Sequence, residues 1–300
     1  DPNNPYELTE DERAVMNSLS ASIINSERLQ THIRYMFSHG ALYKRINGNL
    51  LFHGCIPMDE NGDFLPVDIY GAKCAGRALM DHLDKQIRAS YFSPEKIKKY
   101  GKPGDLMWYL WLAKDSPLFG KEKMTTFERL FIDDKASHKE HVRPYYKLIN
   151  SKEPCEKILR EFGLDPSHSK ILNGHVPVKI KNGESPIKGG GLLYVIDGGI
   201  SKAYQKQTGI AGYTFIFNSR FMALAEHKPY EPLREDGTQK FFSPSMKTVD
   251  TLKTRMLVID TDEGAELLRQ AEAVKRLVEA YKTGEIKERP EGKYSAYKGK

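Results

Sequence analysis

Cysteine is scarce in this sequence, and long hydrophobic runs are absent. Only three cysteines, Cys55, Cys74 and Cys155, occur among the 300 residues. They form no CxxC pair and no zinc-finger spacing, which excludes a disulfide-stapled scaffold and a zinc site built on cysteine. Reduced thiols of this kind are typical of a cytoplasmic protein, and we expect that location. No run approaches the roughly 18 apolar residues of a membrane-spanning helix, so no membrane contact is expected.

A large excess of one charge is also missing. The formal net charge is +6, the two signs are interspersed, and the basic stretches 96–102 and 293–300 are short. No basic patch alternates with aromatic residues, which argues against a nucleic-acid partner. A mild positive excess favours a small anionic substrate. The chain begins with Asp1, and residues 1–12 are polar and acidic, so we expect a fragment without a secretory leader.

Residues 1–40 predict a helical lead-in. Thr9 and Glu12 have the spacing of a capping box at the start of a first helix. A second helix is predicted over 27–37, and Gly40 ends it.

A hairpin and a helical region follow. Asn47-Gly48, between segments 41–46 and 50–53, is the strongest short signal for a hairpin turn. The second hairpin strand therefore delivers His53 at its C-terminal end. Residues 71–163 are mainly helical in pattern and rich in aromatic residues, and they predict an insertion before the later strands.

Strand signals dominate the second half of the chain. Short apolar runs bounded by Gly, Asn, Asp or Pro predict these strands. A helix with one apolar face is predicted from Gly264 to Tyr281, and 285–300 predicts a loose charged tail. The pattern indicates an α/β domain over 41–284. The predicted strands are Ile171-Leu172, Leu192–Ile196, Tyr213–Phe217, Phe221–Ala225 and Met256–Ile259.

Two His–Gly neighbourhoods are candidates for a metal site. His53 precedes Gly54, and His175 follows Gly174; each histidine ends a short apolar run. Site residues of α/β proteins are placed at strand ends, and glycine lets a backbone pass close to an ion. Neutral imidazole binds zinc, manganese and iron. A lone histidine is more often a structural or surface residue, so the residues alone leave both interpretations open.

Two histidines do not complete a hydrolytic metal centre. Catalytic zinc usually takes three protein ligands. A two-metal phosphatase site needs several carboxylates around ions about 3.5–4 Å apart. No DxH, GDxxDR or GNH[DE] run occurs in the sequence. Either the metal interpretation is wrong, or the other ligands lie outside this chain.

Basic side chains near these motifs are candidates for binding a phosphate. Lys179, Lys188, Lys202 and Arg220 lie near the second histidine or near glycine-rich runs. Lysine and arginine make charge-assisted hydrogen bonds to phosphate, although each alone is more often a solvated surface charge.

Three further groups have plainer alternatives to a site. The segment Asp260-Thr261-Asp262 resembles a phosphatase nucleophile motif but is better explained by helix capping. His138, Glu140 and His141 could hold a metal but are better explained as solvated residues. Trp108, Tyr109 and Trp111 predict a core or subunit contact rather than stacking on a ligand.

Several uninterrupted runs carry a family resemblance. They include NLLFHGCIP (49–57), SPLFGK (116–121), TFER (126–129), NGHVPVK (173–179), GESPIK (183–188), VIDGG (195–199) and SKAYQKQTGIAGY (201–213). With these runs, spread over almost the whole chain, the sequence resembles class III fructose-1,6-bisphosphatase, the large form of Firmicutes and related bacteria. That family in turn resembles the calcineurin-like metallophosphoesterases, in which five short blocks supply the ligands of a dinuclear metal centre.

The resemblance assigns roles to the two histidines. It implies that His53 is the ligand of the fourth block and His175 that of the fifth. The first three blocks, which supply Asp, Asn and His ligands and the leaving-group acid, are missing here. The implied fold is α/β: the C-terminal part of a calcineurin-like metallophosphoesterase β-sandwich, flanked by helices and carrying the helical insertion.

The implied reaction is the hydrolysis of fructose 1,6-bisphosphate to fructose 6-phosphate and phosphate, in gluconeogenesis. A dinuclear manganese site would activate the attacking water, with most of its ligands outside this chain. The fragment alone is expected to be inactive, and to form a homo-oligomer or associate with its N-terminal half. The alternative, of another class, is a non-catalytic partner or regulatory module that keeps the phosphatase fold.

Overall fold

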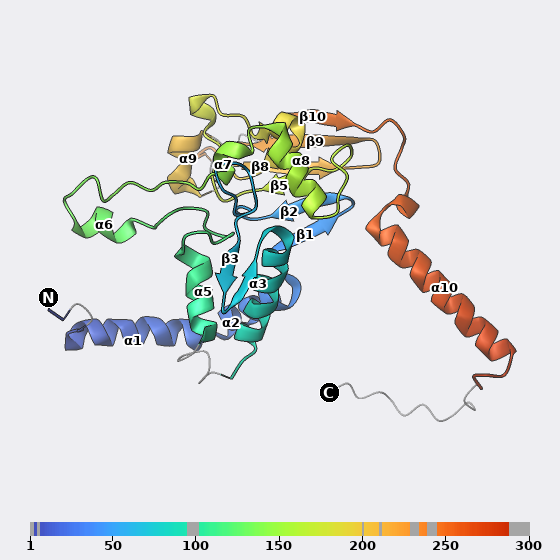
Figure 1. The fold of residues 1–300 in the computed structure, drawn as a ribbon, viewed down its shortest axis with the longest axis horizontal. Helices are drawn as coiled ribbons and strands as arrows, with labels where there is room; N and C mark the ends of the chain where they lie inside the picture. Colours follow the sequence, from blue (N-terminus) through green and yellow to red (C-terminus); the bar gives the residue numbers. More distant parts are fainter. Residues whose placement is uncertain are drawn as a thin grey trace. The chain divides into compact units, whose positions relative to one another are not determined.

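The chain divides into two compact units. The structure, a computed structural model, describes residues 3–4, 7–94, 102–199, 201–209, 212–228, 234–238 and 245–287. The first unit comprises Asp1–Gly199 with Gln207–Gly209, and the second comprises Ile200–Lys206 with Ile210–Lys300. The domain limits predicted from the sequence, at 40, 71, 163 and 284, stay a prediction. Figure 1 shows the elements of both units.

A mixed five-stranded sheet organises the first unit. The strand order is β1-β2-β5-β7-β6, and β2, β5 and β7 run parallel while the two edge strands run antiparallel to their neighbours. The carboxyl ends of the three parallel strands therefore meet at one edge of the sheet, where α/β folds place their sites. The strands are β1 Tyr43–Ile46, β2 Asn49–Phe52, β5 Ile171–Asn173, β6 Ile187–Lys188 and β7 Leu193–Val195.

The predicted hairpin between β1 and β2 is confirmed. Asn47 has a φ of 47° and Gly48 a φ of 74°, while Ile46 pairs with Asn49 across the turn. A two-residue turn that matches the twist of its strands needs positive φ at both positions, which Asn and Gly tolerate. The Asn49 side chain then accepts a hydrogen bond of 3.0 Å from the Lys170 backbone N–H, which links the hairpin to the start of β5.

Helices supply much of the remaining buried core of the first unit. The β2 residue Leu50, the β5 residue Ile171 and the β7 residue Leu193 are fully buried, as are Ile158 and Leu159 on α8. Burying an aliphatic side chain of this size contributes about 1.5–3 kcal/mol. The helices of the predicted insertion are α3 Gly76–Tyr91, α5 Lys102–Leu112, α6 Thr126–Phe131, α7 Tyr145–Leu148 and α8 Lys152–Glu161.

The helical lead-in is confirmed, down to its cap. Helix α1 spans Glu10–Ile24 and α2 spans Glu27–His39. Thr9 N–H donates to the Glu12 carboxylate at 2.8 Å, and Glu12 N–H donates back to the Thr9 hydroxyl at 3.3 Å. This reciprocal pair satisfies two backbone donors that a helix N-terminus leaves open.

Some short elements of the first unit were not predicted. Strands β3 Val67–Ile69 and β4 Ala72–Cys74 form a small separate hairpin, and η1 Ile180–Asn182 and η2 Gly189–Gly191 are 3₁₀ turns. Strands of three residues are too short to show a clear alternation of apolar and polar side chains.

The second unit contains an antiparallel sheet and a long helix. Strands β8 Gly212–Phe217, β9 Phe221–His227 and β10 Ser245–Thr251 pair in the order β10-β9-β8. Helix α9 Lys202–Thr208 precedes the sheet, and α10 Asp262–Lys282 follows it. The strands predicted at 213–217 and 221–225 and the last helix are confirmed. Strand β10 was missed because its sequence, SMKTVDT, is mostly polar and has no fully buried residue.

The strand predicted at Met256–Ile259 is wrong. This segment contains the 3₁₀ turn η3, Val258–Asp260. The Asp260 carboxylate accepts a hydrogen bond of 2.8 Å from Leu257 N–H and closes the turn. Val258 is 63% exposed, so no sheet of the described residues covers the apolar run that suggested a strand.

The exposure of two tryptophans can be compared with the expectation from the sequence. The α5 tryptophans do not fill the core, because Trp108 is 58% and Trp111 is 62% exposed, and the alternative of a subunit contact stays a prediction. Their rings contact each other edge to face instead, with centroids 5.5 Å apart.

In the described part of the chain, no helix combines the length and the apolar character that crossing a membrane requires. The predicted tail, 285–300, lies mostly outside the described residues.

Candidate functional site

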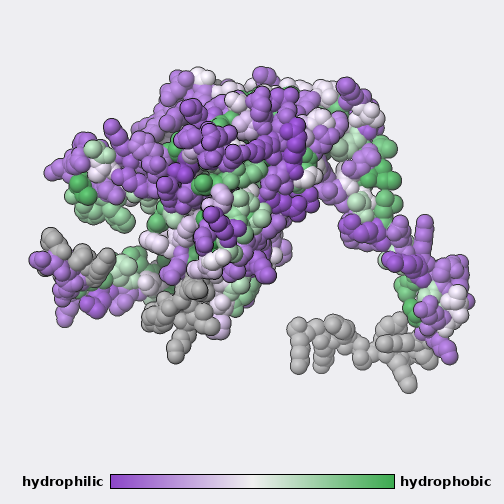
Figure 2. All heavy atoms as spheres, in the orientation of Figure 1, coloured by the Kyte–Doolittle hydropathy of each residue, from purple (hydrophilic) through white to green (hydrophobic). Residues whose placement is uncertain are grey.

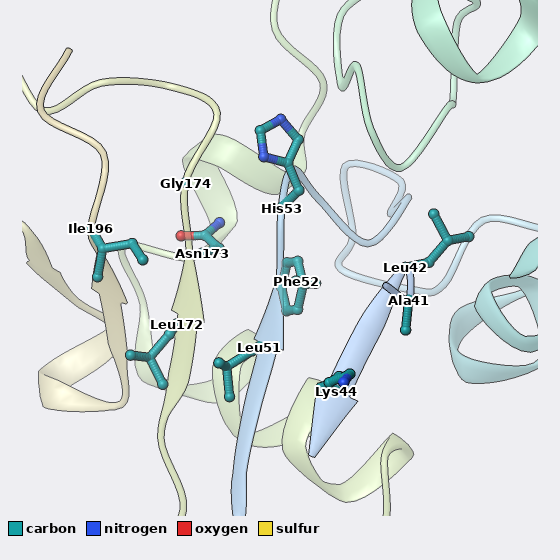
Figure 3. Close-up of a pocket in the computed structure, with 10 residues that line it drawn as sticks. All are labelled: Ala41, Leu42, Lys44, Leu51, Phe52, His53, Leu172, Asn173, Gly174 and Ile196. Atoms are coloured by element: carbon teal, nitrogen blue, oxygen red, sulfur yellow. The ribbon is translucent and has the colours of Figure 1, made fainter. Parts of the chain in front are cut away.

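The strand ends bring His53 and His175 into direct contact. His53 follows β2 and His175 follows β5, the neighbouring parallel strand. Nε2 of His53 lies 3.0 Å from Nδ1 of His175, and the backbone N–H of Gly174 donates to the His53 carbonyl at 2.9 Å. Figure 3 shows the His53 ring at the end of its strand, beside the loop that carries Gly174. The fold therefore joins the two His–Gly neighbourhoods that the sequence singled out.

His175 has an unusual backbone conformation. Its φ is 67°, in the left-handed region that a residue with a side chain seldom occupies, and Val176 N–H donates to the Gly174 carbonyl at 2.8 Å around it. Such a conformation costs about 1–3 kcal/mol, and it is found most often at functional sites. The turn directs the imidazole back toward β2.

A third segment fixes the orientation of the His175 ring. Nε2 of His175 lies 2.8 Å from the backbone carbonyl of Phe119. A carbonyl only accepts, so Nε2 carries the proton and Nδ1, which faces His53, keeps its lone pair. A histidine that binds a metal almost always donates its other ring N–H to such an acceptor.

The loop that contains Phe119 also holds the first histidine segment. Cys55 N–H donates to the Pro117 carbonyl at 2.9 Å. A Cβ atom on Gly54 would lie 2.4 Å from the same Pro117 oxygen, closer than any real contact. Glycine is therefore required at position 54 for this approach. The loop 116–121 acts as a common support for both histidines.

Partial burial lowers the pKa of both imidazoles. The pKa of His53 is lowered mainly by burial, against the raising effect of the Asp197 carboxylate. The pKa of His175 is lowered first by burial and then by His53, while the hydrogen bond to Phe119 opposes the shift. Neutral imidazole is the form that binds metal ions.

The histidine pair fits a metal ion but does not complete a site. Two nitrogen ligands about 2.1 Å from one ion and at right angles to each other lie about 3.0 Å apart, which is the separation found here. Among the residues that the structure describes, no group of three or more His, Cys, Asp or Glu side chains could hold a metal ion. Within the described residues, the two histidines therefore do not form a metal site by themselves.

Asp197 lies at the end of β7, the third parallel strand of the row. A Cβ atom on Gly174 would be 3.6 Å from Cβ of Asp197. One carboxylate oxygen accepts a hydrogen bond of 2.8 Å from Gly199 N–H, and the negative charge of Asp197 opposes the lowering of the two histidine pKa values. The three adjacent strands thus end in His, His and Asp.

An apolar hollow of about 300 Å³ lies on the sheet beside His53. Leu51, Leu172 and Ile196 form its apolar wall, and Asn173 reaches its edge (Figure 3). The amide nitrogen of Asn173 is used twice, toward the Gly54 carbonyl at 3.2 Å and the Tyr145 hydroxyl at 2.8 Å, while its buried oxygen has no partner among the described residues. The site is thus bordered by an apolar sheet face.

The predicted phosphate-binding residues come from both units of the chain. Lys188 is engaged by Glu184 at 3.0 Å and by Asn150 at 3.3 Å, and Glu184 also accepts from the Lys179 backbone N–H at 3.0 Å. Arg220 lies in the β8–β9 turn of the second unit, where its N–H donates to Asn218 at 2.8 Å. Lys202 begins α9, but its side chain lies outside the described residues. Their role in substrate binding stays a prediction.

The weaker candidates have structural partners. His138 Nε2 lies 2.8 Å from the Ile132 carbonyl, and Glu140 binds Lys121 at 2.7 Å and the Thr125 hydroxyl at 3.0 Å. Thr261 caps α10, its hydroxyl accepting from Gly264 N–H at 3.1 Å. The capping interpretation of the 260–262 segment is therefore confirmed.

Sequence reasoning missed the supporting residues of the site. Phe119, Pro117, Asp197 and Asn173 all lie within the runs SPLFGK, VIDGG and NGHVPVK. Those runs were used only as signs of a resemblance. Three such runs in separate segments could have suggested that their loops meet at one edge of the sheet. Which loops contact each other, however, depends on which strands are neighbours in the sheet.

Comparisons with known proteins identify relatives of this chain. The sequence profile described as "Firmicute fructose-1,6-bisphosphatase" matches residues 1–283. The chain is similar to a protein of Clostridium tetani named "Fructose-1,6-bisphosphatase class 3", with 49% identity over 292 residues, 96% of this chain and 44% of that protein. A protein of the same name from Fusobacterium nucleatum is 47% identical over 289 residues, 95% of this chain and 44% of its own length. No solved structure matches. The chain spans less than half the length of these relatives.

Proposed function

The chain belongs to the Firmicute fructose-1,6-bisphosphatase family, and from this we propose that His53 and His175 are metal ligands of an enzyme that hydrolyses fructose 1,6-bisphosphate. The observation that carries the proposal is the 3.0 Å contact between Nε2 of His53 and Nδ1 of His175. Support comes from the Phe119 carbonyl, which leaves the Nδ1 lone pair free to bind an ion. The relatives' names supply the substrate.

The rest of the ligand set would come from outside this chain. The chain aligns with 44% of the Clostridium tetani protein. We propose that the other part of a full-length protein supplies carboxylate and further nitrogen ligands, so that two manganese ions bind. The fold would then be that of a calcineurin-like metallophosphoesterase, with this chain as its C-terminal part, acting in the cytoplasm. Alone, the chain would be inactive and would pair with its N-terminal half.

The chemistry divides between the ions and the protein. Divalent ions held there would act on the phosphate as Lewis acids and would lower the pKa of the attacking water. His53 and His175 would hold one ion in place as neutral ligands, with the Phe119 carbonyl fixing the ring of His175. Leu51 and Leu172 form an apolar wall of the hollow beside His53, and a substrate that covered this hollow would strengthen electrostatic interactions there.

Lys179, Lys188, Lys202 and Arg220 are proposed to meet the second phosphate of the substrate. Lysine and arginine bind phosphate through charge-assisted hydrogen bonds. Lys188 would first have to leave Glu184, to which it is bound at 3.0 Å. Alanine at a residue that has this role would raise KM for the bisphosphate and leave KM for a monophosphate ester unchanged.

The test uses the full-length protein with manganese. His53→Ala and His175→Ala should each lower bound manganese, measured by mass spectrometry, and reduce kcat for fructose 1,6-bisphosphate by about 100-fold or more. His168→Ala is the matched control, because His168 is exposed on the loop before β5. Variants that retain both metal and activity would contradict the ligand roles. If the intact protein cleaved another phosphoester but left the bisphosphate untouched, the substrate would be wrong.

A further inference from the structure

Helix α10 carries an apolar stripe with the spacing of a coiled-coil seam. Its 21 residues include Leu267, Ala271, Val274, Val278 and Tyr281, separated alternately by four and three positions. This alternation is the heptad pattern that keeps one seam of a helix facing a partner helix. The helix is about 31 Å long, and the seam covers two of its heptads.

Among the described residues of the second unit, none covers the stripe. Leu267 is 50%, Val274 58% and Val278 45% exposed, although such side chains are usually buried in folded proteins. Leu268 and Leu277, which flank the seam, are 47% and 46% exposed. Figure 2 shows green apolar spheres on η3 and on part of α10 beside purple polar ones. Contiguous apolar surface of this kind marks an interaction site.

The charges of the helix differ between its two halves. Residues 262–271 contain three carboxylates, of Asp262, Glu263 and Glu266, against one guanidinium, of Arg269. Residues 272–282 contain three cations against two carboxylates; of these cations Lys275 and Lys282 flank the seam, whereas Arg276 lies on the opposite face of the helix. An antiparallel partner with the same sequence would bring its basic half to the level of this acidic half. A parallel partner would bring like charges together, which is unfavourable.

The sizes of the seam residues also favour an antiparallel pair. With the two helices aligned about a twofold axis, Leu267 of one copy lies opposite Val278 of the other, and Ala271 lies opposite Val274. Each layer then combines a larger with a smaller side chain, which fills space better than Ala271 against Ala271 in a parallel pair. Opposed helix dipoles add to the preference.

We propose that α10 binds α10 of a second copy of this chain as an antiparallel pair through the seam Leu267–Tyr281. The interface is isologous, so it closes into a dimer rather than a filament. The apolar residues of η3, Leu257, Val258 and Ile259, are 56%, 63% and 57% exposed at the N-terminal end of the helix. They extend the seam toward the end of the partner helix. The proposal does not depend on the metal site.

The first test measures the mass of the chain in solution by light scattering and sedimentation. The chain should be a dimer at about 50 μM, and Leu267→Asp with Val278→Asp should make it monomeric, raising the dissociation constant at least about 100-fold. Both positions are exposed, so the variant should keep the far-ultraviolet circular dichroism of the parent. Arg276→Asp, on the opposite face of the helix, is the control and should stay dimeric.

The second test fixes the direction of the pair by disulfide formation. A Cys74→Ser background removes the least buried native thiol. In that background, Leu267→Cys combined with Val278→Cys should cross-link two chains under mild oxidation, while Leu267→Cys alone should not, because residue 267 lies opposite residue 278 only in the antiparallel pair. Efficient cross-linking of the single variant would establish a parallel pair and overturn the proposal. A chain that is monomeric at every concentration, with α10 covered by its own chain or by another protein, would overturn it as well.

Discussion

The backbone carbonyl of Phe119 accepts a hydrogen bond of 2.8 Å from Nε2 of His175, across 56 positions of the chain. This contact decides which ring nitrogen of His175 is protonated, and so leaves Nδ1 as the lone pair that faces His53. The loop that carries Phe119 is held in turn against Gly54. The orientation of the site therefore depends on a close backbone contact that can be tested.

Gly54→Ala should disturb the site, and Gly174→Ala should not. A Cβ atom at position 54 would lie 2.4 Å from the Pro117 oxygen, whereas one at position 174 would have 3.6 Å to its nearest neighbour. The loop must shift in the first variant, at a cost of about 1–3 kcal/mol in the free energy of unfolding. Urea unfolding measures this cost. Manganese affinity of the full-length protein should fall about 10-fold in Gly54→Ala only. Equal effects of the two variants would refute the support role of the loop.

The metal-free chain should lose stability as the pH falls below neutrality. The pKa values of His53 and His175 are both lowered, mainly by burial. A group with a depressed pKa binds fewer protons in the folded state, so the unfolded state gains stability once the pH drops through the ordinary histidine pKa of about 6.5. The free energy of unfolding, from urea titrations at pH 7.5 and 5.5, should be smaller at pH 5.5.

The control for this pH dependence is the double variant His53→Asn with His175→Asn. It removes both titrating groups and should reduce the difference between pH 7.5 and pH 5.5. A difference as large as that of the parent chain would mean that other groups cause it.

A single cysteine should react quickly in the native chain. Burial raises the pKa of the Cys55 thiol and of the Cys155 thiol to about 12, from an ordinary value of 9.0, so both stay protonated at pH 8. Cys74 is only half-buried. Since the thiolate is the reactive form, a disulfide reagent at pH 8 should titrate one thiol rapidly and three in concentrated guanidinium. Rapid reaction of two or three thiols in the folded chain would contradict this burial.

The same shifts have a consequence for alkaline stability. A thiol with a raised pKa contributes stability that is fully present below the unfolded-state value of 9.0. It is lost as the pH rises from there toward 12.

Thr261→Ala should shorten or destabilise α10. The Thr261 hydroxyl accepts from Gly264 N–H at 3.1 Å and is the N-cap of the helix. Loss of such a cap costs about 0.5–2 kcal/mol. Helicity by circular dichroism and the thermal midpoint of the second unit report the change. Thr261→Ser keeps the hydroxyl and should restore most of the loss, and failure of this rescue would argue against capping.

The sequence by itself determined the local structure where a few adjacent residues carry the physical reason. The capping box of Thr9 and Glu12 and the Asn47-Gly48 turn depend only on side chains and dihedral angles close by in the chain. The periodicity of the α10 stripe depends on the helix itself. The family resemblance likewise depends on runs of adjacent residues, and it pointed to His53 and His175 without their geometry.

Only the tertiary structure decided which distant segments meet. The order β2-β5-β7 places the ends of three strands side by side, so that His53, His175 and Asp197 become neighbours. No local pattern predicts that loop 116–121 supports both histidines. The segment 256–259 shows the reverse: an apolar run suggested a strand, but without a sheet to cover it a local hydrogen bond to Asp260 determines a turn. Strand pairing is set by packing between distant residues, and that information is not contained in any single stretch of the chain.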